Sequence, residues 1–196
     1  GAIAEQSTLP SVHNGCMFCP NGAINDCTVL KRDLTLDVDP ALYPFIQGSS
    51  DTEVCFFLAL TYGLAENPVV AITRMIERVE RARAERGVTA AFRGAFAASD
   101  GERLIVARWV SPEAGQTPVP SLFHSQGPVT LHIGEGFGGQ SLGTETLPDD
   151  AQLIASEPLE LHWSRRTWHE IPNATIGVFT RGAEPVFSAL SPTSTS

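Results

Sequence analysis

Four residues near the start of the chain have a spacing that could hold a metal ion. His13, Cys16, Cys19 and Cys27 follow the pattern His-x-x-Cys-x-x-Cys-x7-Cys. Cys-x-x-Cys is a common chelating spacing, and one imidazole with three thiolates could complete a tetrahedral zinc site. The second pair of closely spaced ligands that such sites usually contain is missing, because Cys27 stands alone. We therefore expect no metal and no other cofactor, and keep a structural zinc site as an alternative.

Other patterns that could do chemistry are weaker. Residues 134–139 are rich in glycine, but they have neither the spacing nor the strand-to-helix context of a phosphate-binding loop. His132, His162 and His169 lie in strand-like segments, where a partly buried, hydrogen-bonded histidine is the ordinary case. No serine lies in a recognisable nucleophile elbow. These residues therefore receive no catalytic role.

Two further places carry polar groups of the kind that binding sites use, although each also has an ordinary explanation. Asn21-Gly22 is a common turn dipeptide. Asp51 stands at a predicted helix start, where the helix dipole favours a carboxylate. His13-Asn14-Gly15 contains a second Asn-Gly pair. Neither place indicates a site by itself.

The totals describe one folded domain. The chain has 196 residues, of which 42% are hydrophobic and 18% charged, so it can bury a real core. The net charge of −9 disfavours binding to nucleic-acid phosphates. No apolar run reaches the roughly 18 residues of a membrane span. Four cysteines without a small disulfide framework favour the cytoplasm, and Gly1 in place of Met indicates a processed product or a fragment.

Two helices are predicted one after the other. Ser50-Asp51-Thr52-Glu53 has the pattern of a capping box, and the apolar residues 54–60 predict a helix covered on both sides. A second helix should begin at Asn67-Pro68 and end at Gly87. Its buried stripe should contain Val69, Ile72, Met75, Ile76 and Val79, and its charged residues, namely Glu77, Arg78, Glu80, Arg81, Arg83 and Glu85, should form a solvated face.

Strands follow the helices, because the hydrophobic period changes to two after Val88. Residues 90–96 and 103–109 flank Ser99-Asp100-Gly101, which predicts a hairpin. Further strands are expected at residues 121–125, 152–156, 175–180 and 186–190, whereas residues 2–26 look like loops joined to short strands. This order predicts an α+β domain over residues 1–190, with some sheet partners missing, and a disordered tail over residues 191–196.

Three stretches, in the same order, resemble the class II glutamine amidotransferases of the ergothioneine-pathway and related γ-glutamyl hydrolase type. Residues 9–13 and 19–26 resemble that family's His-Pro-Phe segment followed by His-Asn-Gly-x-Ile-Asn. Residues 48–53 are similar to its Gly-x-x-Asp-Ser-Glu at a helix start. Residues 154–159, with 168–172 after them, resemble the strand-turn-strand that closes its sheet.

Two shorter matches lie between these stretches, so the resemblance spans almost the whole chain. Arg108-Trp109 and residues 120–123 stand where the family has Arg-Tyr and Pro-Ser-Leu-Tyr. The family belongs to the N-terminal nucleophile hydrolases, so the resemblance implies their layers of antiparallel sheet and helices. It also implies roles: the Asn21 side chain and the Gly22 N–H would stabilise an oxyanion, and Asp51 and Gly22 would bind the α-ammonium end of glutamine.

The chain departs from the family pattern at its catalytic residues. The family's two histidines are replaced by Leu9 and Pro20, and Pro20 also removes a backbone donor. The family's nucleophile is an N-terminal cysteine, which Gly1 cannot replace, and its carboxylate-binding arginine would lie upstream. The sequence therefore predicts hydrolysis of glutamine or a γ-glutamyl amide through a thioester only if a second chain supplies the cysteine segment. The alternatives are a non-catalytic binding subunit on the same scaffold and a zinc-stapled interaction module.

Overall fold

The structure is a computed structural model that describes residues 9–48, 50–112, 120–126, 129–135, 141–148, 151–158 and 167–191. The chain forms two compact units, one of Gly1–Pro120 with Asn173–Ser196 and one of Ser121–Pro172. The predicted single domain over residues 1–190 remains a prediction. Apart from Ser191, the predicted disordered tail lies outside the described residues.

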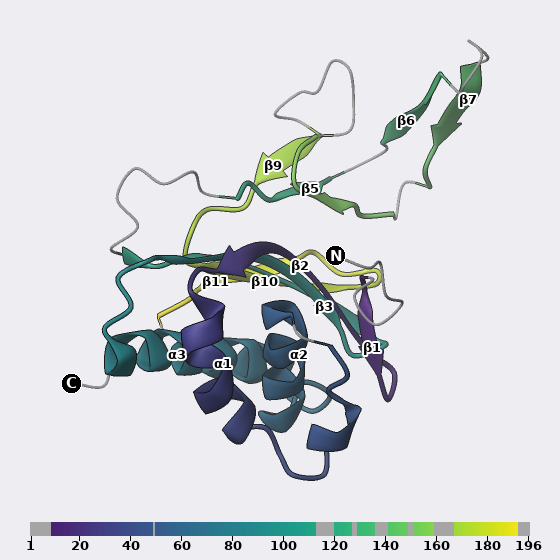
Figure 1. The fold of residues 1–196 in the computed structure, drawn as a ribbon. Helices are drawn as coiled ribbons and strands as arrows, with labels where there is room; N and C mark the ends of the chain where they lie inside the picture. The colour runs from purple at the N-terminus through teal and green to yellow at the C-terminus, as the bar shows by residue number, and fades with distance from the viewer. Residues whose placement is uncertain are drawn as a thin grey trace. The chain divides into compact units, whose positions relative to one another are not determined.

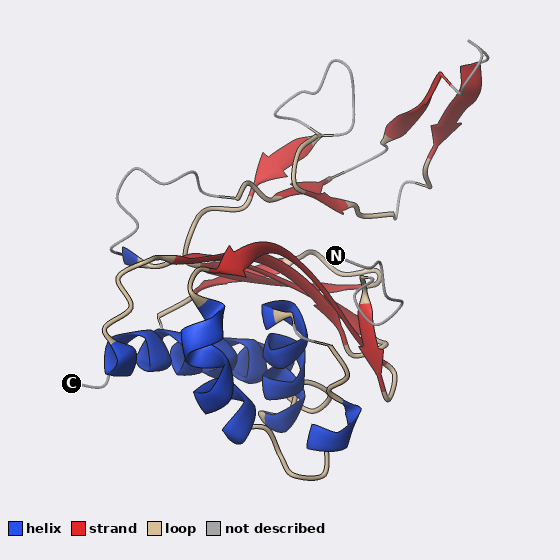
Figure 2. Ribbon diagram, in the orientation of Figure 1, coloured by secondary structure: helices blue, strands red, loops and turns tan. Residues whose placement is uncertain are grey.

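The first unit is a six-stranded antiparallel sheet with helices on one face (Figures 1 and 2). Its strands, in spatial order, are β1 (Ser11–His13), β2 (Cys16–Ile24), β3 (Phe92–Ser99), β4 (Arg103–Val110), β10 (Thr175–Thr180) and β11 (Val186–Ala189). The covering helices are α1 (Cys27–Leu36), the short η2 (Tyr43–Phe45), α2 (Asp51–Thr61) and α3 (Pro68–Arg86).

The second unit contains short strands only, among the residues described. In it, β5 (Phe123–Ser125) pairs with both β8 (Ile154–Ala155) and β9 (Trp168–Glu170). A separate hairpin joins β6 (Thr130–Glu135) to β7 (Ser141–Thr146). Among the described residues of both units, every strand pair is antiparallel. The predicted α+β class with antiparallel sheets is therefore confirmed.

The main core lies between the six-stranded sheet and the helices. Phe18 of β2 stacks between Phe56 of α2 and Phe96 of β3, with ring centroids 5.9 and 5.7 Å apart. Seven consecutive residues of α2, Glu53 to Ala59, are buried, which confirms that this helix is covered on both sides. Burying an aromatic or aliphatic side chain contributes about 1.5–3 kcal/mol, so each large side chain of this layer adds to the stability of the unit.

The start of α2 is fixed by a variant of the predicted capping box. The Ser50 hydroxyl accepts a hydrogen bond from the Glu53 N–H at 3.2 Å, as expected for an N-cap serine. In a standard capping box the Glu53 carboxylate would accept from the Ser50 N–H. Here it accepts instead from the N–H groups of Gln47 and Gly48, at 2.9 and 2.7 Å. The incoming loop is thereby tied to the first turn that carries Asp51.

The prediction of loops joined to short strands for residues 2–26 was wrong at β2, which is nine residues long. β1 and β2 form a hairpin around Asn14-Gly15, whose φ values of 47° and 80° are those of a tight hairpin turn. β2 then continues without interruption to Ile24, so Asn21-Gly22 lies inside a strand and not in a turn. Of the two Asn-Gly pairs, only the first forms a turn.

Helix α1 was not predicted. Only Leu30 and Leu34 of its ten residues are buried, and Asp26 at its N-cap makes no side-chain capping bond. The sequence therefore carries neither a strong apolar stripe nor a start signal there.

The predicted solvated face of α3 was wrong at two of its arginines. Arg78 and Arg83 are 7% and 4% exposed, and they pair with Asp37 and Glu80. The predicted bounds of α3 are otherwise confirmed, with Pro68 in its first turn and Gly87 as its left-handed C-cap.

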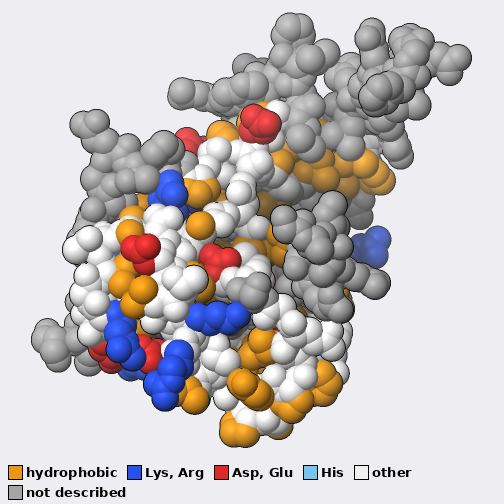
Figure 3. Space-filling view, in the orientation of Figure 1, with side chains coloured by type: hydrophobic (Ala, Val, Ile, Leu, Met, Phe, Trp, Pro, Cys, Tyr) orange, Lys and Arg blue, Asp and Glu red, His pale blue; other side chains and the backbone are white. Residues whose placement is uncertain are grey.

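The surface of the first unit carries one exposed apolar corner. Tyr43 and Phe45 are 56% and 49% exposed, and hydrophobic side chains gather around η2 at this corner (Figure 3). Within the described part of the chain, no helix combines the length and apolar character needed to cross a membrane.

Candidate functional site

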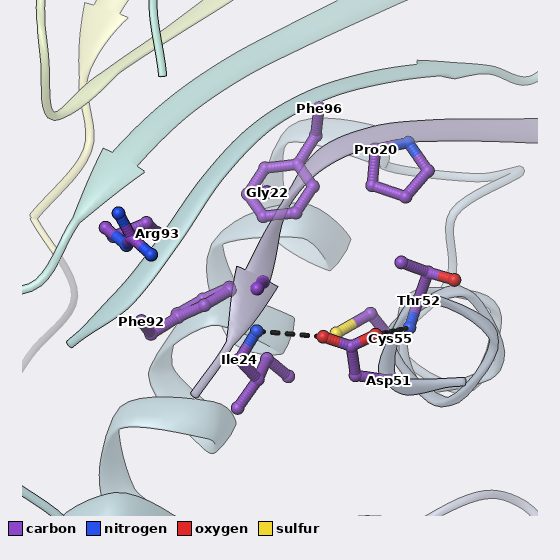
Figure 4. A pocket seen from close by; sticks show the side chains of 10 residues that line it. Pro20, Gly22, Ile24, Asp51, Thr52, Cys55, Phe92, Arg93 and Phe96 are labelled. Carbon is purple, nitrogen blue, oxygen red and sulfur yellow. Dashed lines mark hydrogen bonds between the residues drawn. The ribbon is translucent and has the colours of Figure 1, made fainter. Parts of the chain in front are cut away.

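A small hollow, open to solvent on one side, lies where β2 ends beside the first turn of α2 (Figure 4). The hollow is shallow: its cavity volume is about 10 Å³, and the value rises to about 220 Å³ only when the open solvent at its mouth is included. Both Gly22 and Asp51 line it, as the sequence predicted, although Asn21 does not. The full lining consists of Pro20, Gly22, Ala23, Ile24, Asp51, Thr52, Cys55, Phe92, Arg93 and Phe96.

Asp51 joins the helix to the strand. Its Oδ2 accepts a hydrogen bond from the Ile24 N–H at 2.8 Å, and its Oδ1 accepts one from the Thr52 N–H at 3.0 Å (Figure 4). A carboxylate has about four acceptor positions, so each oxygen can accept a further donor. Asp51 therefore has a structural role in holding the strand end and retains acceptor capacity toward the hollow.

The bond from Ile24 also fixes the direction of the Gly22 backbone. In a strand of an antiparallel sheet, the N–H and C=O of one residue point to the same side, and residues two apart point alike. Ile24 directs its N–H away from β3 toward Asp51, so Gly22 presents its N–H and C=O along that same edge. β1 pairs only with Cys16 to Phe18, so this edge lies beyond β1. Pro20 lies two residues before Gly22, so its backbone nitrogen also faces this edge, where a missing N–H removes no hydrogen bond of the sheet.

Gly22 also has a packing reason to be glycine. A Cβ at this position would stand 2.2 Å from the Arg93 carbonyl oxygen and 2.7 Å from the Gly94 Cα on the neighbouring strand. Its φ of +152° is also one that other residues rarely adopt. Glycine is thus required by the approach of β2 to β3, whatever its part in chemistry.

Asn21 lies on the other face of the sheet from the hollow. Cys16, Phe18 and Ile24 of β2 belong to the core beneath the helices, so alternation places the Asn21 side chain, which is exposed, on the opposite face. Its neighbour across the sheet is Ala95. The structure therefore brings Gly22 and Asp51 together, with Asn21 adjacent in the strand but projecting from the far face.

The four residues of the alternative zinc site do not converge. Cys16 is 1% exposed on the helix side, whereas Cys19, three residues along the same strand, is exposed on the opposite face. The His13 ring packs against Phe45, with centroids 4.6 Å apart. Among the residues that the structure describes, no group of three potential metal ligands comes together.

We expect these cysteines to differ sharply in reactivity. Iodoacetamide at pH 7.5 should modify Cys19 first, because Cys16 and Cys55 are buried and burial raises the pKa of both thiols. Cys27 should react slowly, because burial, with a smaller contribution from Asp51, raises its pKa to about 11. Peptide mass spectrometry over time gives the order. Equal protection of Cys16 and Cys19, relieved by a chelator, would instead support the zinc site.

Of the other residues in the hollow, Cys55 could have been identified from the sequence, whereas Phe92 and Arg93 could not. Cys55 lies four residues after Asp51 on α2, so helical spacing places both on one face. Phe92 and Arg93 have no such signal, because they reach the hollow only through the register that pairs Ile24 with Phe92 and Ala23 with Arg93.

Comparisons with known proteins found one curated relative by sequence. The chain is 26% identical to a protein of Saccharomyces cerevisiae described as "Probable glutamine amidotransferase DUG3", over 90% of this chain and 53% of that protein, so it spans about half the relative's length. No protein-family model matches the chain.

Two solved structures share the fold. A glutamine aminotransferase class-II domain protein from Silicibacter pomeroyi superposes with a TM-score of 0.72 at 23% identity, covering 97% of this chain and 74% of that one. The glutamine phosphoribosylpyrophosphate amidotransferase from Bacillus subtilis gives a TM-score of 0.52 at 19% identity, covering 93% and 31%. The resemblance seen in the sequence is therefore confirmed at the level of the fold, which this chain shares with class II glutamine amidotransferase domains of the N-terminal nucleophile hydrolase type.

Proposed function

We propose that this domain binds the amino-acid head group of glutamine or of a γ-glutamyl amide in the hollow between β2 and α2. The observation that carries the proposal is the shared position of Gly22 and Asp51, with the Gly22 N–H and C=O directed along the same edge as the Ile24–Asp51 bond. The Asp51 carboxylate and the Gly22 carbonyl would both accept from the ligand's α-ammonium group. A charge-assisted bond of this kind is about twice as strong as a neutral one.

Hydrolysis would then proceed at the edge of β2 that faces Asp51. The Gly22 N–H and the Asn21 side-chain amide are adjacent along the strand, and both would donate to the oxyanion of the tetrahedral intermediate. A cysteine from a segment outside these residues, on a second chain or upstream, would attack the amide carbon, release the amine and leave a thioester for water to cleave. We expect this reaction in the cytoplasm.

The cysteines beside the hollow do not suit the role of nucleophile. Burial and then the nearby Asp51 carboxylate raise the pKa of both Cys27 and Cys55, so both remain protonated at neutral pH. A nucleophile must be a thiolate. Activity would therefore depend on a cysteine from elsewhere.

A non-catalytic binding subunit is the second candidate, and the replaced histidines favour it. Leu9 and Pro20 stand where the resembling family has histidine, and the Pro20 ring is buried in the wall of the hollow. Binding without turnover would be the expected behaviour of such a subunit. Both candidates require the same head-group site.

The proposal predicts that Asp51→Asn weakens glutamine binding about tenfold or more, because the ammonium loses its charged partner while the side chain keeps its size. Isothermal titration of the full chain with L-glutamine measures the affinity. Asp26→Asn is the matched control, since Asp26 is exposed, lies two residues after Ile24 and does not line the hollow. An Asp51→Asn protein that binds like wild type would remove Asp51 from the site, and no binding by the wild type would reject the ligand class.

Asn21→Ala tests the catalytic candidate when glutamine binding and ammonia release are both measured, and the wild type in the same two assays distinguishes the enzyme from the binding subunit. Because the Asn21 side chain lies on the far face from the hollow, glutamine binding should change less than about twofold. With the cysteine segment present, release of ammonia from glutamine should slow by about 100-fold, the usual effect of losing one oxyanion donor. Wild-type protein that binds glutamine but releases no ammonia with that segment present would favour the binding subunit.

A further inference from the structure

Two histidines lie against each other in the small sheet formed by β8, β5 and β9. His124 of β5 and His169 of β9 are directly opposite in an antiparallel pair, and the two strands lie side by side in Figure 1. Their rings are stacked, with centroids 5.3 Å apart and an angle of 28° between the ring planes. His124 is 7% exposed and His169 is half-buried. Two groups that ordinarily titrate near neutral pH are therefore held together inside a sheet.

The backbone keeps the two rings opposite each other. On one side of the pair, the Gln126 N–H donates to the Thr167 carbonyl at 2.8 Å. On the other side, the Ile171 N–H donates to the Leu122 carbonyl, also at 2.8 Å. These bonds fix the register between the two strands. The rings can therefore move apart only by turning about their side-chain bonds or by opening of the sheet.

The described residues around the pair supply no countercharge. Alternation places only apolar or uncharged side chains beside the histidines on their face of the sheet, namely Leu122, Gln126, Ile154, Thr167 and Ile171. Glu170 lies opposite Phe123 on the other face, and Glu157 lies beyond the end of β8. Within the described parts of β5, β8 and β9, no further titratable side chain faces the two rings.

Burial and proximity both oppose protonation of the pair. Moving a charged imidazolium out of water is unfavourable, and two imidazolium rings at this distance repel each other. The Nε2 atom of His169 is buried without a hydrogen-bond partner among the described residues, so an N–H there would have no acceptor. Burial, with a smaller contribution from His169, lowers the pKa of His124 below its ordinary value of 6.5.

The direction of the pH effect follows from the lowered pKa of His124. In an opened strand this imidazole takes up a proton near pH 6.5, whereas in the folded sheet it does so only at a lower pH. The folded sheet therefore binds fewer protons than the opened one. Its stability is complete above about pH 6.5 and decreases as the pH falls toward the lowered pKa.

We propose that the stacked rings of His124 and His169 form a pH-sensitive switch, which keeps β5 paired with β9 while both rings are neutral and opens this sheet at mildly acidic pH. The six-stranded sheet has no such pair in its described strands, where His13 packs against Phe45. Acid should therefore open the small sheet while the six-stranded sheet stays closed. The switch does not depend on the head-group site proposed above.

Hydrogen exchange of the full chain, followed by mass spectrometry at pH 7.5 and pH 5.0, measures how often each strand opens. After correction for the pH dependence of intrinsic exchange, peptides that contain β5 and β9 should open about tenfold or more often at pH 5.0. Peptides that contain β3 and β4 should change by less than about twofold. Equal changes in the two sheets, or no change in β5 and β9, would overturn the proposal.

Replacement of the histidines tests whether the pair causes the change. The double variant His124→Gln/His169→Gln has no proton to gain at either position, so β5 and β9 should open equally often at both pH values, within about twofold. His13→Gln is the matched control, because it removes one histidine from β1 and should retain the full response. A double variant that still opens in acid, or a control that no longer does, would assign the response to other groups.

A measurement on the wild type covers the case in which the double variant is already open at pH 7.5. Proton NMR follows the His124 ring as the pH is lowered, with His124→Gln used to assign its signal. The midpoint should lie below pH 6.5, at the same pH as the opening of β5 and β9. A midpoint at or above pH 6.5 would overturn the switch.

Discussion

Replacing Gly22 with alanine is expected to lower the free energy of unfolding by about 3 kcal/mol or more, because the added methyl group has no space. Its Cβ would stand 2.2 Å from the Arg93 carbonyl oxygen, and both atoms belong to paired backbones that cannot rotate away. β2 would have to move from β3 at the point where Asp51 holds the strand end. Urea unfolding followed by circular dichroism measures the loss.

Gly182→Ala is the matched control for the backbone. Gly182 has a φ of +75° and no atom within 4 Å of an added Cβ, so alanine there carries only the conformational penalty, about 1 kcal/mol. Equal losses in the two variants would show that close approach to Arg93 is not what restricts position 22. If Gly22→Ala is the less stable, as we expect, then Gly22 cannot be taken as catalytic merely because it is glycine.

Predictions from local signals were the successful ones. α2 and α3 begin at Ser50 and Asn67, whose side chains accept the capping bonds expected of them, and Gly87 ends α3. The hairpin of β3 and β4 forms around Ser99 and Gly101 as the alternating pattern indicated. These signals act over three or four residues, so no knowledge of distant partners is needed.

β2 was missed because its sequence contradicts local rules for strands. It contains Pro20 and the Asn21-Gly22 pair, both typical of turns. The structure accommodates Pro20 at an edge position where no N–H is needed, and Gly22 at a close contact with β3. Those contacts depend on a strand some 70 residues away, as the pairing of Asn21 with Ala95 shows.

The candidate site likewise depends on contacts between strands that are distant in the sequence. The order of the motifs and the start of α2 predicted that Gly22 and Asp51 lie close together, and both line the hollow; their roles in binding remain a prediction. It could not show that Asn21 projects from the other face, because that depends on which residues of β2 face the helices. Nor could it place Arg93 beside Ala23, which only the register between β2 and β3 determines.

The charged side of α3 was misread for a related reason. Charged side chains on a long amphipathic helix usually face water, but Arg83 and Glu80 meet the ends of β3 and β4. Arg83 donates to the Ala90 carbonyl at 2.9 Å and to the Ser111 hydroxyl at 2.8 Å, and it pairs with Glu80. Burying a charge requires such partners, and those partners come from distant parts of the chain.

Glu80→Ala is therefore expected to lower the free energy of unfolding by about 3 kcal/mol, the lower end of the range for breaking a buried ion pair. Glu80 accepts from the Trp109 indole N–H at 2.6 Å and from the Ser111 hydroxyl at 2.7 Å, and its removal leaves Arg83 without this countercharge. The lower end applies because the Glu80 side chain is 19% exposed, so water compensates for part of the loss. Urea unfolding again measures the change.

Glu85→Ala supplies the comparison on the same helix. Its side chain is 54% exposed and lies 3.8–3.9 Å from Arg78 and Arg81, so its loss should cost less than about 0.5 kcal/mol. Glu80→Gln should fall between the two, because it keeps an acceptor for Trp109 and removes the charge opposite Arg83. Glu80→Ala as mild as Glu85→Ala would mean that water replaces the carboxylate. A large loss would show instead that Glu80 holds α3 against the strand that carries Phe92 and Arg93 into the hollow.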